Sequence, residues 1–360
     1  MLMSGSFRRT VSAFTMITLA LAVGCGGSEP SPSSNGGGGG TGGGGGTGGE
    51  GAACGEGPTI VLAMDRMLMG ETNPDLTPNP SDGWRQYGLD LDGRASVEGS
   101  TDLCKPAMGA ASSEVYPDGD GGIDNAFGKS IAPLISEISG GVPLTKDAAE
   151  HINTGTLTYL ITLEGLGELT SCALPASRLY RGYKMPNHPK FDGTDEWPLE
   201  PSMLEDPADP ASAKNVFLES AVVDNQYKSG PEANFSFILD VKGVALVLPI
   251  RHGRFQMTLD PDHEGATMGQ LGGVLDTEEL VESLLEFAAF FDQSVCDPNG
   301  AARESLVSRI RQASDILSDG TQAAAKECNG VSIGMGFTMK RAKLGQVGNP
   351  LWQVAPACMP

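Results

Sequence analysis

Apolar and polar residues alternate along several short stretches of the chain, a pattern typical of strands. Residues 157–164 place leucine, tyrosine and isoleucine at alternate positions, with threonine on the other face, which predicts a half-buried strand. Residues 331–339 keep the same period and give the clearest strand pattern in the chain. Further β-rich runs lie at 215–224, 234–241, 244–250 and 254–259. Pro249 is expected at a sheet edge or a bulge, because proline has no amide hydrogen to donate.

Apolar residues spaced three and four apart predict two helices before the last strand. The first is expected to begin at a cap formed by Asp276 and Thr277. The second is expected over residues 301–317. The proline-rich and acidic segment 186–210 is expected to be a long surface loop. These patterns together predict an α+β fold that is β-rich, with sandwich-like antiparallel sheets, a C-terminal helical segment and disulfide links.

The N-terminal residues follow the order of a secretory signal. An apolar stretch at 11–23 follows two arginines, and Cys25 comes directly after it. Residues 21–25 (LAVGC) resemble the lipobox of bacterial lipoproteins, in which the cysteine is acylated and becomes the mature N-terminus. Ala22 stands where that pattern usually has leucine. The resemblance implies a signal peptide at 1–24 and a lipid on Cys25, and ordinary cleavage without modification is the alternative.

Residues 25–53 are expected to comprise the lipidated cysteine and a disordered tether, because glycine, serine, proline and threonine offer little apolar surface to bury. A flexible chain of this length spans roughly 30 Å. The lipoprotein resemblance implies a lipid anchor in the bacterial cell envelope. Gly26 favours the outer membrane, since an aspartate at that position often signals inner-membrane retention. The folded extracytoplasmic part is then 54–360, as one domain or as 54–150 followed by 151–360.

The charge balance excludes some classes of partner. The chain has 45 acidic and 24 basic residues and a net charge of −21, which argues against nucleic-acid binding because neutralising phosphates requires lysine and arginine. The folded part contains no apolar run of the length that a membrane helix needs. Membrane contact is therefore expected through the lipid alone. Of the 50 glycines, 33 lie in residues 54–360, and they indicate many tight turns there.

The cysteine count also indicates export. One of the seven cysteines is the proposed lipid site, and the six that remain suit three disulfides in an oxidising compartment. The sequence leaves their pairing open. One pair, Cys296–Cys328, is predicted because these two residues bracket a helical segment. The six cysteines are Cys54, Cys104, Cys172, Cys296, Cys328 and Cys358.

Aspartate and glycine dominate two stretches, at 88–93 (GLDLDG) and 118–125 (DGDGGIDN). Calcium takes about six to eight oxygen ligands, and short aspartates separated by glycine let a loop curl around it. The second stretch resembles calcium-binding loops. Ile123 and Lys129 stand where an EF-hand requires glycine and glutamate, so that motif is excluded. A calcium site is predicted here, and a pair of hydrated turns is the alternative. The candidate ligands are Asp118, Asp120, Asp124, Asp90 and Asp92.

Recognisable catalytic chemistry is scarce in this sequence. It contains no HExxH zinc motif. Residues 330–334 (GVSIG) have the spacing GxSxG, but they lie in the predicted strand 331–339 rather than at the turn between a strand and a helix where a nucleophilic serine stands. Trp197 lies in the acidic, proline-rich segment and is a candidate for stacking on a sugar ring, with Trp84 and Trp352 as alternatives. A non-enzymatic binding or adhesion protein is therefore expected, with a polysaccharide or an envelope protein as its partner. A surface-structural role and an exported hydrolase with an unrecognised carboxylate pair stay open.

The lipid anchor can be tested by mass. Protein extracted from membranes is expected to begin at Cys25 and to carry several acyl chains, since one chain alone binds a bilayer only marginally. Intact mass spectrometry measures both features. The Cys25→Ser variant lacks the thiol that accepts the lipid and is expected to leave the membrane fraction. A free thiol at Cys25 in the membrane-extracted protein would contradict the prediction.

Overall fold

A computed structural model describes residues 52–107, 118–349 and 358. The expected signal peptide, the lipid site at Cys25 and the tether up to residue 51 lie outside the described residues, and so does Trp352. The described residues belong to one compact unit. None of the helices among them has the length and apolar character needed to cross a membrane.

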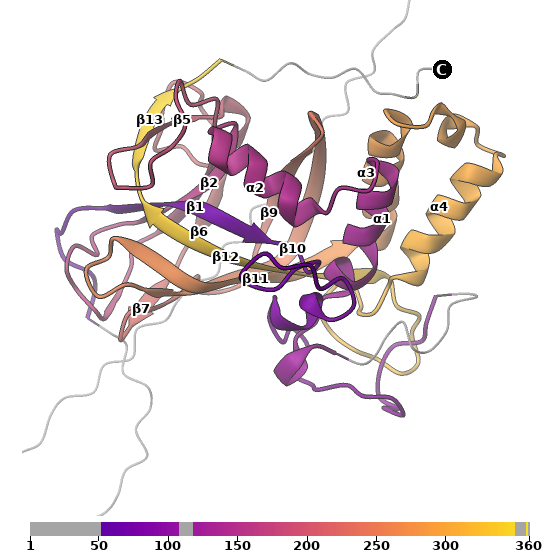
Figure 1. Cartoon of the computed structure of the whole chain (residues 1–360). Coiled ribbons are helices and arrows are strands. Elements are labelled where there is room, and N and C mark those ends of the chain that lie inside the picture. Colours follow the sequence, from indigo (N-terminus) through magenta and orange to yellow (C-terminus); the bar gives the residue numbers. More distant parts are fainter. Residues whose placement is uncertain (1–51, 108–117, 350–357, 359–360) are drawn as a thin grey trace, which may run out of the picture. The chain divides into compact units, whose positions relative to one another are not determined.

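The described residues contain thirteen strands in one sheet, in the order β13-β5-β4-β2-β1-β12-β11-β10-β8-β7-β3, with β6 beside β4 and β9 beside β10. Paired strands are antiparallel apart from β13 and β5, which are parallel and lie side by side in Figure 1. The strands are β1 (Ile60–Leu68), β2 (Leu157–Leu163), β3 (Cys172–Ala173), β4 (Ser177–Tyr183), β5 (Glu196–Leu199), β6 (Asn215–Phe217), β7 (Ala221–Val223), β8 (Gln226–Lys228), β9 (Ala233–Val241), β10 (Val244–Leu259), β11 (Gly265–Asp276), β12 (Gly330–Arg341) and β13 (Lys343–Val347).

The sheet curls so that strands far apart in its order face one another. Tyr159 in β2 and Phe237 in β9 stack with their ring centroids 4.1 Å apart. Four strands lie between β2 and β9 in the sheet, which in a flat sheet would separate them by roughly 24 Å. The Tyr159 hydroxyl donates to the Ile238 carbonyl at 3.0 Å and accepts from its amide at 2.6 Å. The inner face of the curl therefore forms the main hydrophobic core.

Helices cover parts of this sheet. Helix α2 contacts β1, β2 and β9, whereas α3 contacts β10 and β11. Figure 1 shows α3 and α4 together, away from β5 and β13. The described α-helices are α1 (Ala132–Ile138), α2 (Leu144–Thr154), α3 (Thr277–Ala289) and α4 (Ala301–Gln312). Short 3₁₀ turns lie at Gly83–Gln86, Asp120–Gly122, Pro201–Met203 and Gln293–Cys296, and a π turn at Phe127–Ile131.

The predicted fold class is confirmed: the protein is β-rich with C-terminal helices, and its strands join a single curled sheet. Helix α3 begins as predicted, because the Asp276 side chain accepts hydrogen bonds from the amides of Glu278 and Glu279. Helix α4 ends earlier than predicted, at Gln312. The chain after it turns so that Ile316 pairs with Gly330 of β12.

Strands lie at the predicted positions, but some of them begin or end at other residues than predicted. The runs 244–250 and 254–259 form one continuous strand, β10, whereas 215–224 divides into β6 and β7. Pro249 lies where β10 pairs with β9 alone, since the pairing with β11 begins at Ile250. On its β11 side, Pro249 therefore lies at an edge, as expected. No strand pairs with it there, so its missing amide hydrogen costs no hydrogen bond to β11.

The prediction that β2 is half-buried, with its threonine face toward solvent, is wrong. Thr158 and Thr162 are 0% and 3% exposed, because a second hydrophobic cluster packs on that face. Segment 186–210 helps to form this cover and includes strand β5, so it is more than a surface loop. The second cluster consists of Ala63, Leu160, Tyr180, Trp197, Leu199, Leu204, Ala213 and Ala342.

Three disulfides join the six predicted cysteines, as Cys54–Cys172, Cys104–Cys328 and Cys296–Cys358. The predicted bridge Cys296–Cys328 is therefore wrong. Helix α4 lies between these two cysteines in the chain and, at 12 residues, is about 18 Å long. The segment after α4 then carries Cys328 to Cys104 rather than back to Cys296. Three disulfides are characteristic of an extracytoplasmic protein.

Glycines on β11 and β12 leave room for the segment that leads into the first aspartate stretch. A Cβ atom added at Gly334 would lie 2.3 Å from the Tyr87 carbonyl oxygen, and one at Gly336 would lie 2.4 Å from the Tyr87 ring. A Cβ atom at Gly272 would lie 2.8 Å from the Leu89 side chain. These separations are shorter than van der Waals contact. Residues 87–89 can therefore rest on the sheet only because these positions have no side chain.

Replacing Gly334 with alanine tests this contact. The added methyl group would clash with a backbone oxygen, so the free energy of unfolding is expected to fall by about 1–3 kcal/mol. Urea unfolding with the disulfides intact measures it. The matched control is Gly55→Ala, where an added Cβ meets no atom within 4 Å and a change within about 0.5 kcal/mol is expected. Equal stabilities of the Gly334→Ala variant and the wild type would contradict the account.

Candidate functional site

The two aspartate stretches lie beside each other. Leu89 and Asp124 form an isolated antiparallel bridge, in which the Asp124 amide donates to the Leu89 carbonyl at 3.0 Å. The Leu91 amide donates to Asp124 Oδ2 at 2.7 Å. This pairing brings one carboxylate oxygen from each of Asp90, Asp92 and Asp124 within 4.8 Å of one another. We call these three residues the aspartate triad.

A buried asparagine fixes the second stretch on the sheet. Asn125 Oδ1 accepts from the amides of Gly334 in β12 and Gly128, at 2.9 and 2.8 Å. Its Nδ2 donates to the carbonyls of Trp84 and Tyr87, at 3.1 and 2.9 Å. An asparagine amide has two donor and two acceptor positions, and all four are used here. The position of the neighbouring Asp124 is thereby set by the sheet.

Two side chains from the sheet hold the first stretch. Gln270 in β11 accepts from the Gly88 amide at 2.8 Å and donates to the Gln86 carbonyl at 3.3 Å. Arg254 in β10 donates through Nη2 to the Asp90 carbonyl at 3.1 Å. The triad is therefore linked to β10 and β11 by side chains and to β12 through Asn125.

Burial raises the pKa of several carboxyl groups in this region. Asp124 is 2% exposed, and burial followed by repulsion from Asp315 and Asp92 raises its pKa to about 9. Burial is also the largest cause at Asp118, where the pKa is raised to about 6, and at Asp315, where it is raised to about 7. Metal binding requires ionised carboxylates, so a cation bound here would displace protons.

The triad could hold one hard cation. Asp90 Oδ1 accepts from the amides of Gly93 and Arg94, at 2.7 and 3.2 Å, and Asp92 Oδ1 accepts from Arg94 at 2.9 Å. Asp92 Oδ2 is buried and has no hydrogen-bond partner among the described residues. Calcium takes about six to eight oxygen ligands, so three carboxylates would need water or further protein oxygens to complete the set. Calcium binding stays a prediction.

The other two predicted ligands lie outside the triad. Asp118 accepts a hydrogen bond from the Ser96 amide, and its charge contributes to the raised pKa of Asp124. The Asp120 side chain is 67% exposed and pairs with Arg85 at 3.4 Å. The structure therefore gathers three of the five predicted ligands and leaves Asp120 as a surface residue.

The prediction that Trp197 stacks on a ligand is wrong. Trp197 is 0% exposed and belongs to the second hydrophobic cluster. It is buried because its strand, β5, pairs with β4 and β13 instead of extending into solvent. Trp84, one of the alternatives, is 6% exposed. Neither ring is accessible to a sugar.

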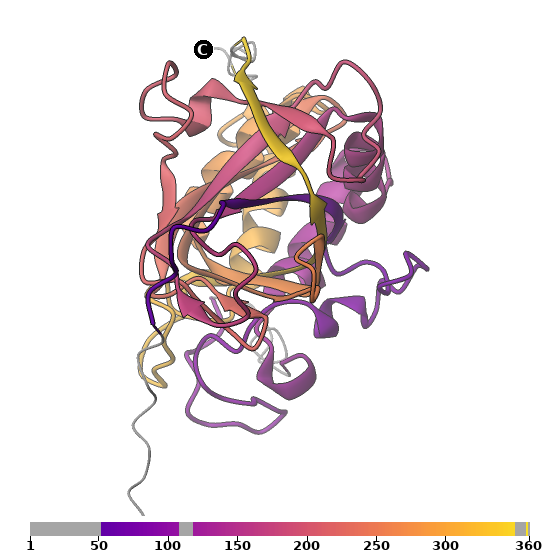
Figure 2. The same ribbon diagram turned by 90° about the vertical axis from the view of Figure 1, so that its left-hand side faces the viewer.

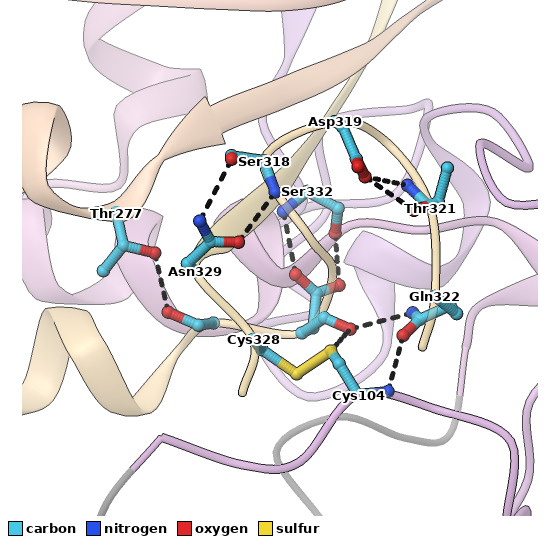
Figure 3. The surroundings of a disulfide bond; sticks show 11 residues. Cys104, Thr277, Ser318, Asp319, Thr321, Gln322, Cys328, Asn329 and Ser332 are labelled. Atoms are coloured by element: carbon cyan, nitrogen blue, oxygen red, sulfur yellow. Dashed lines mark hydrogen bonds between the residues drawn. A yellow bond between two sulfur atoms is a disulfide. The ribbon is translucent and has the colours of Figure 1, made fainter. Parts of the chain in front are cut away.

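Sequence reasoning missed Asp315, which lies after α4 in the segment leading to the Cys104–Cys328 disulfide. Its carboxylate accepts from the Ser332 amide at 2.8 Å and from the Ser332 hydroxyl at 2.5 Å. Figure 3 shows Gln322 beside the disulfide, where its amide oxygen accepts from the Cys104 amide at 2.9 Å. The sequence around Asp315 follows neither a metal-binding nor a capping pattern, so only the tertiary structure identifies it.

A hollow opens beside the triad, on the outward side of β8, β10 and β11. It consists of a cavity of about 790 Å³ and one of about 430 Å³ that share Lys228 and Gln256. The smaller cavity reaches Asp90, and Met268 in the larger one is 69% exposed. The polar side chains that line the hollow include Gln226, Gln256, Gln270, Thr258, Lys228 and Arg254.

Comparison with known proteins identifies no relative. The chain matches no family model, no curated protein and no solved structure. The chemistry of the site therefore has to be inferred from its own residues, which offer clustered carboxylates on one side and a row of amides on the other.

Calcium is expected to stabilise the protein through the triad. The melting temperature should be several degrees higher in calcium than in chelator, because the cation offsets the repulsion between the carboxylates. The Asp124→Asn variant keeps an acceptor for the Leu91 amide but loses the charge, so it should lose the calcium effect. Asp120→Asn is the control and should respond like the wild type. Identical wild-type curves in calcium and in chelator would contradict the prediction.

In chelator, the contribution of Asp124 to the free energy of unfolding is expected to change with pH in one direction. The folded-state pKa of Asp124 is raised from 3.8 to about 9, so its stabilising contribution is complete at low pH and is lost as the pH rises toward that value. The Asp124→Asn variant stays neutral throughout. Between about pH 5 and pH 8 its stability in chelator is therefore expected to increase relative to the wild type. A difference that is constant over this range would contradict the assignment.

Proposed function

We propose that this protein is a lipid-anchored, extracytoplasmic protein of the bacterial envelope that binds a polysaccharide without catalysis. The observation that carries the proposal is the hollow on the outward side of β8, β10 and β11, lined by a row of amides and adjoining the aspartate triad. The disulfides support an extracytoplasmic location. The lipid anchor rests on the resemblance of residues 21–25 to a lipobox.

The side chains of the hollow suit sugar hydroxyls. Each glutamine amide offers donors and an acceptor in one plane, and a hydroxyl can serve as both. Gln226 already accepts from the Thr258 hydroxyl at 3.1 Å, which holds its amide in place. The exposed Met268 adds an apolar surface against which the C–H face of a sugar ring could pack. Gln226 and Lys228 are exposed, so an extended chain could reach them.

The triad and the hollow share structural supports. Gln270 and Arg254 line the hollow and also bind the backbone of residues 86–90. A cation that fixes the aspartate stretches would therefore also fix the positions of Gln270 and Arg254 in the hollow. Polysaccharide binding is expected to weaken in chelator for this reason.

The hydrolase alternative needs two carboxylates that both reach the substrate. Asp224 also lines the hollow, in its larger cavity, and the experiment below tests it together with Asp90. Within the triad, Asp90 lines the hollow but Asp124 is only 2% exposed. This difference supports binding over hydrolysis at the triad. A purely structural role, which needs no ligand, would appear in the experiment below as the absence of binding.

Binding can be tested with the mature protein on an array of neutral and acidic oligosaccharides, in calcium and in chelator. At least one oligosaccharide should be retained, more strongly in calcium. The Gln256→Ala variant removes a hydrogen-bonding amide from the centre of the hollow and is expected to lower the affinity about fivefold, since one hydrogen bond contributes about 1 kcal/mol.

The matched control is Gln312→Ala, because the Gln312 amide on α4 bonds Ser308 outside the hollow. That variant should bind like the wild type. Failure to retain any oligosaccharide would overturn the proposal in favour of a structural role. Release of shortened oligosaccharides would overturn it in favour of a hydrolase.

A further inference from the structure

A separate cavity of about 500 Å³ lies against β1, β2, β4 and β13. Among the residues that the structure describes, those that line this cavity are all different from those that line the hollow on β8, β10 and β11. In Figure 2, the yellow C-terminal strands β12 and β13 run past the indigo strand β1 in this region. The side chains that line this cavity include Val61, Thr162, Glu164, Arg178, Tyr180, Arg341, Lys343 and Leu344.

Positive charge is concentrated around this cavity. Of the described residues that line it, three are cationic and one, Glu164, is acidic and already pairs with Arg178. Arg341 and Lys343 have no carboxylate within 4.0 Å among the residues described by the structure. Their charge is available to a ligand.

Backbone hydrogen bonds fix the segment that carries Arg341 and Lys343. The Arg341 amide donates to the Glu264 carbonyl at 2.8 Å, and the Lys343 amide donates to the Asp195 carbonyl at 2.8 Å. Between them, the Ala342 amide donates to a carbonyl of β1 at 3.0 Å. Both side chains therefore project from a fixed strand junction, and neither is needed to maintain it.

The charged and apolar side chains that line this cavity suit a ligand with an oxyanion group. A guanidinium group can bind two oxygens of one carboxylate or phosphate in parallel, and a nearby ammonium group adds a second charge-assisted bond. Val61 and Leu344 supply an apolar wall, and the volume lies within the range of small-molecule sites. We infer that this cavity binds the oxyanion group of a sugar-sized ligand, carboxylate or phosphate, through Arg341 and Lys343. The inference does not depend on the proposed polysaccharide site.

Calorimetric titration of the mature protein tests the inference, with glucuronate, inorganic phosphate and neutral glucose as probes. Glucuronate or phosphate should bind, and glucose should not. The affinity should fall as salt is raised, because the contacts are ionic and partly exposed. The double variant Arg341→Gln/Lys343→Gln is expected to bind at least about tenfold more weakly.

Lys340→Gln is the matched control, because Lys340 is the adjacent cation on β12 but does not line the cavity. It should bind like the wild type. Binding of glucuronate alone or of phosphate alone supports the inference and identifies which oxyanion the cavity accepts. Absence of heat with both anions, or an equal loss in Lys340→Gln and in the double variant, would overturn it. A melting curve of the double variant checks that its fold is retained, and the Lys343→Gln single variant, expected to bind more weakly than the wild type, replaces it if it does not fold.

Discussion

The rest of the candidate site depends on one close contact, between residues 84–89 and the glycines of β11 and β12. Without side chains at Gly334 and Gly336, the backbone of Tyr87 rests directly on the sheet. Only at that distance can Asn125 bond two carbonyls of this segment and the Gly334 amide at the same time. The glycine content of the chain therefore does more than form turns. It creates the surface on which the aspartate stretches meet.

Gathering carboxylates in this way has an electrostatic cost. Burial disfavours the charged form of Asp124, and the neighbouring Asp92 and Asp315 add repulsion, so the group must be protonated or compensated by a cation. Hydrogen bonds to Asn125 and Gln270 hold the stretches together against this repulsion. The same contacts connect the triad to the hollow on β8, β10 and β11, so metal binding and ligand binding would share one scaffold. The cationic cavity beside β13 has the opposite charge and lies apart from that scaffold.

Local features of the fold could be predicted from the sequence, and features that depend on distant segments could not. The cap at Asp276 and the strands around 157–163 and 331–339 follow from neighbouring residues, and the structure contains them. Trp197 is buried because β5 pairs with β13, about 150 residues later in the chain, and no local pattern reveals such a pairing. The disulfide partners and Asp315 depend on tertiary structure in the same way. The aspartate stretches identified the candidate ligands, but only the pairing of Leu89 with Asp124 shows which of them converge.

The sheet brings Asp90, Asp92 and Asp124 together, and we predict that these three residues hold a cation. The most direct measurement is anomalous X-ray diffraction from crystals of the mature protein grown in calcium. An anomalous peak is expected between the three carboxylates, with oxygen ligands at about 2.3–2.6 Å. Well-ordered carboxylates in that map without an anomalous peak between them would contradict this prediction.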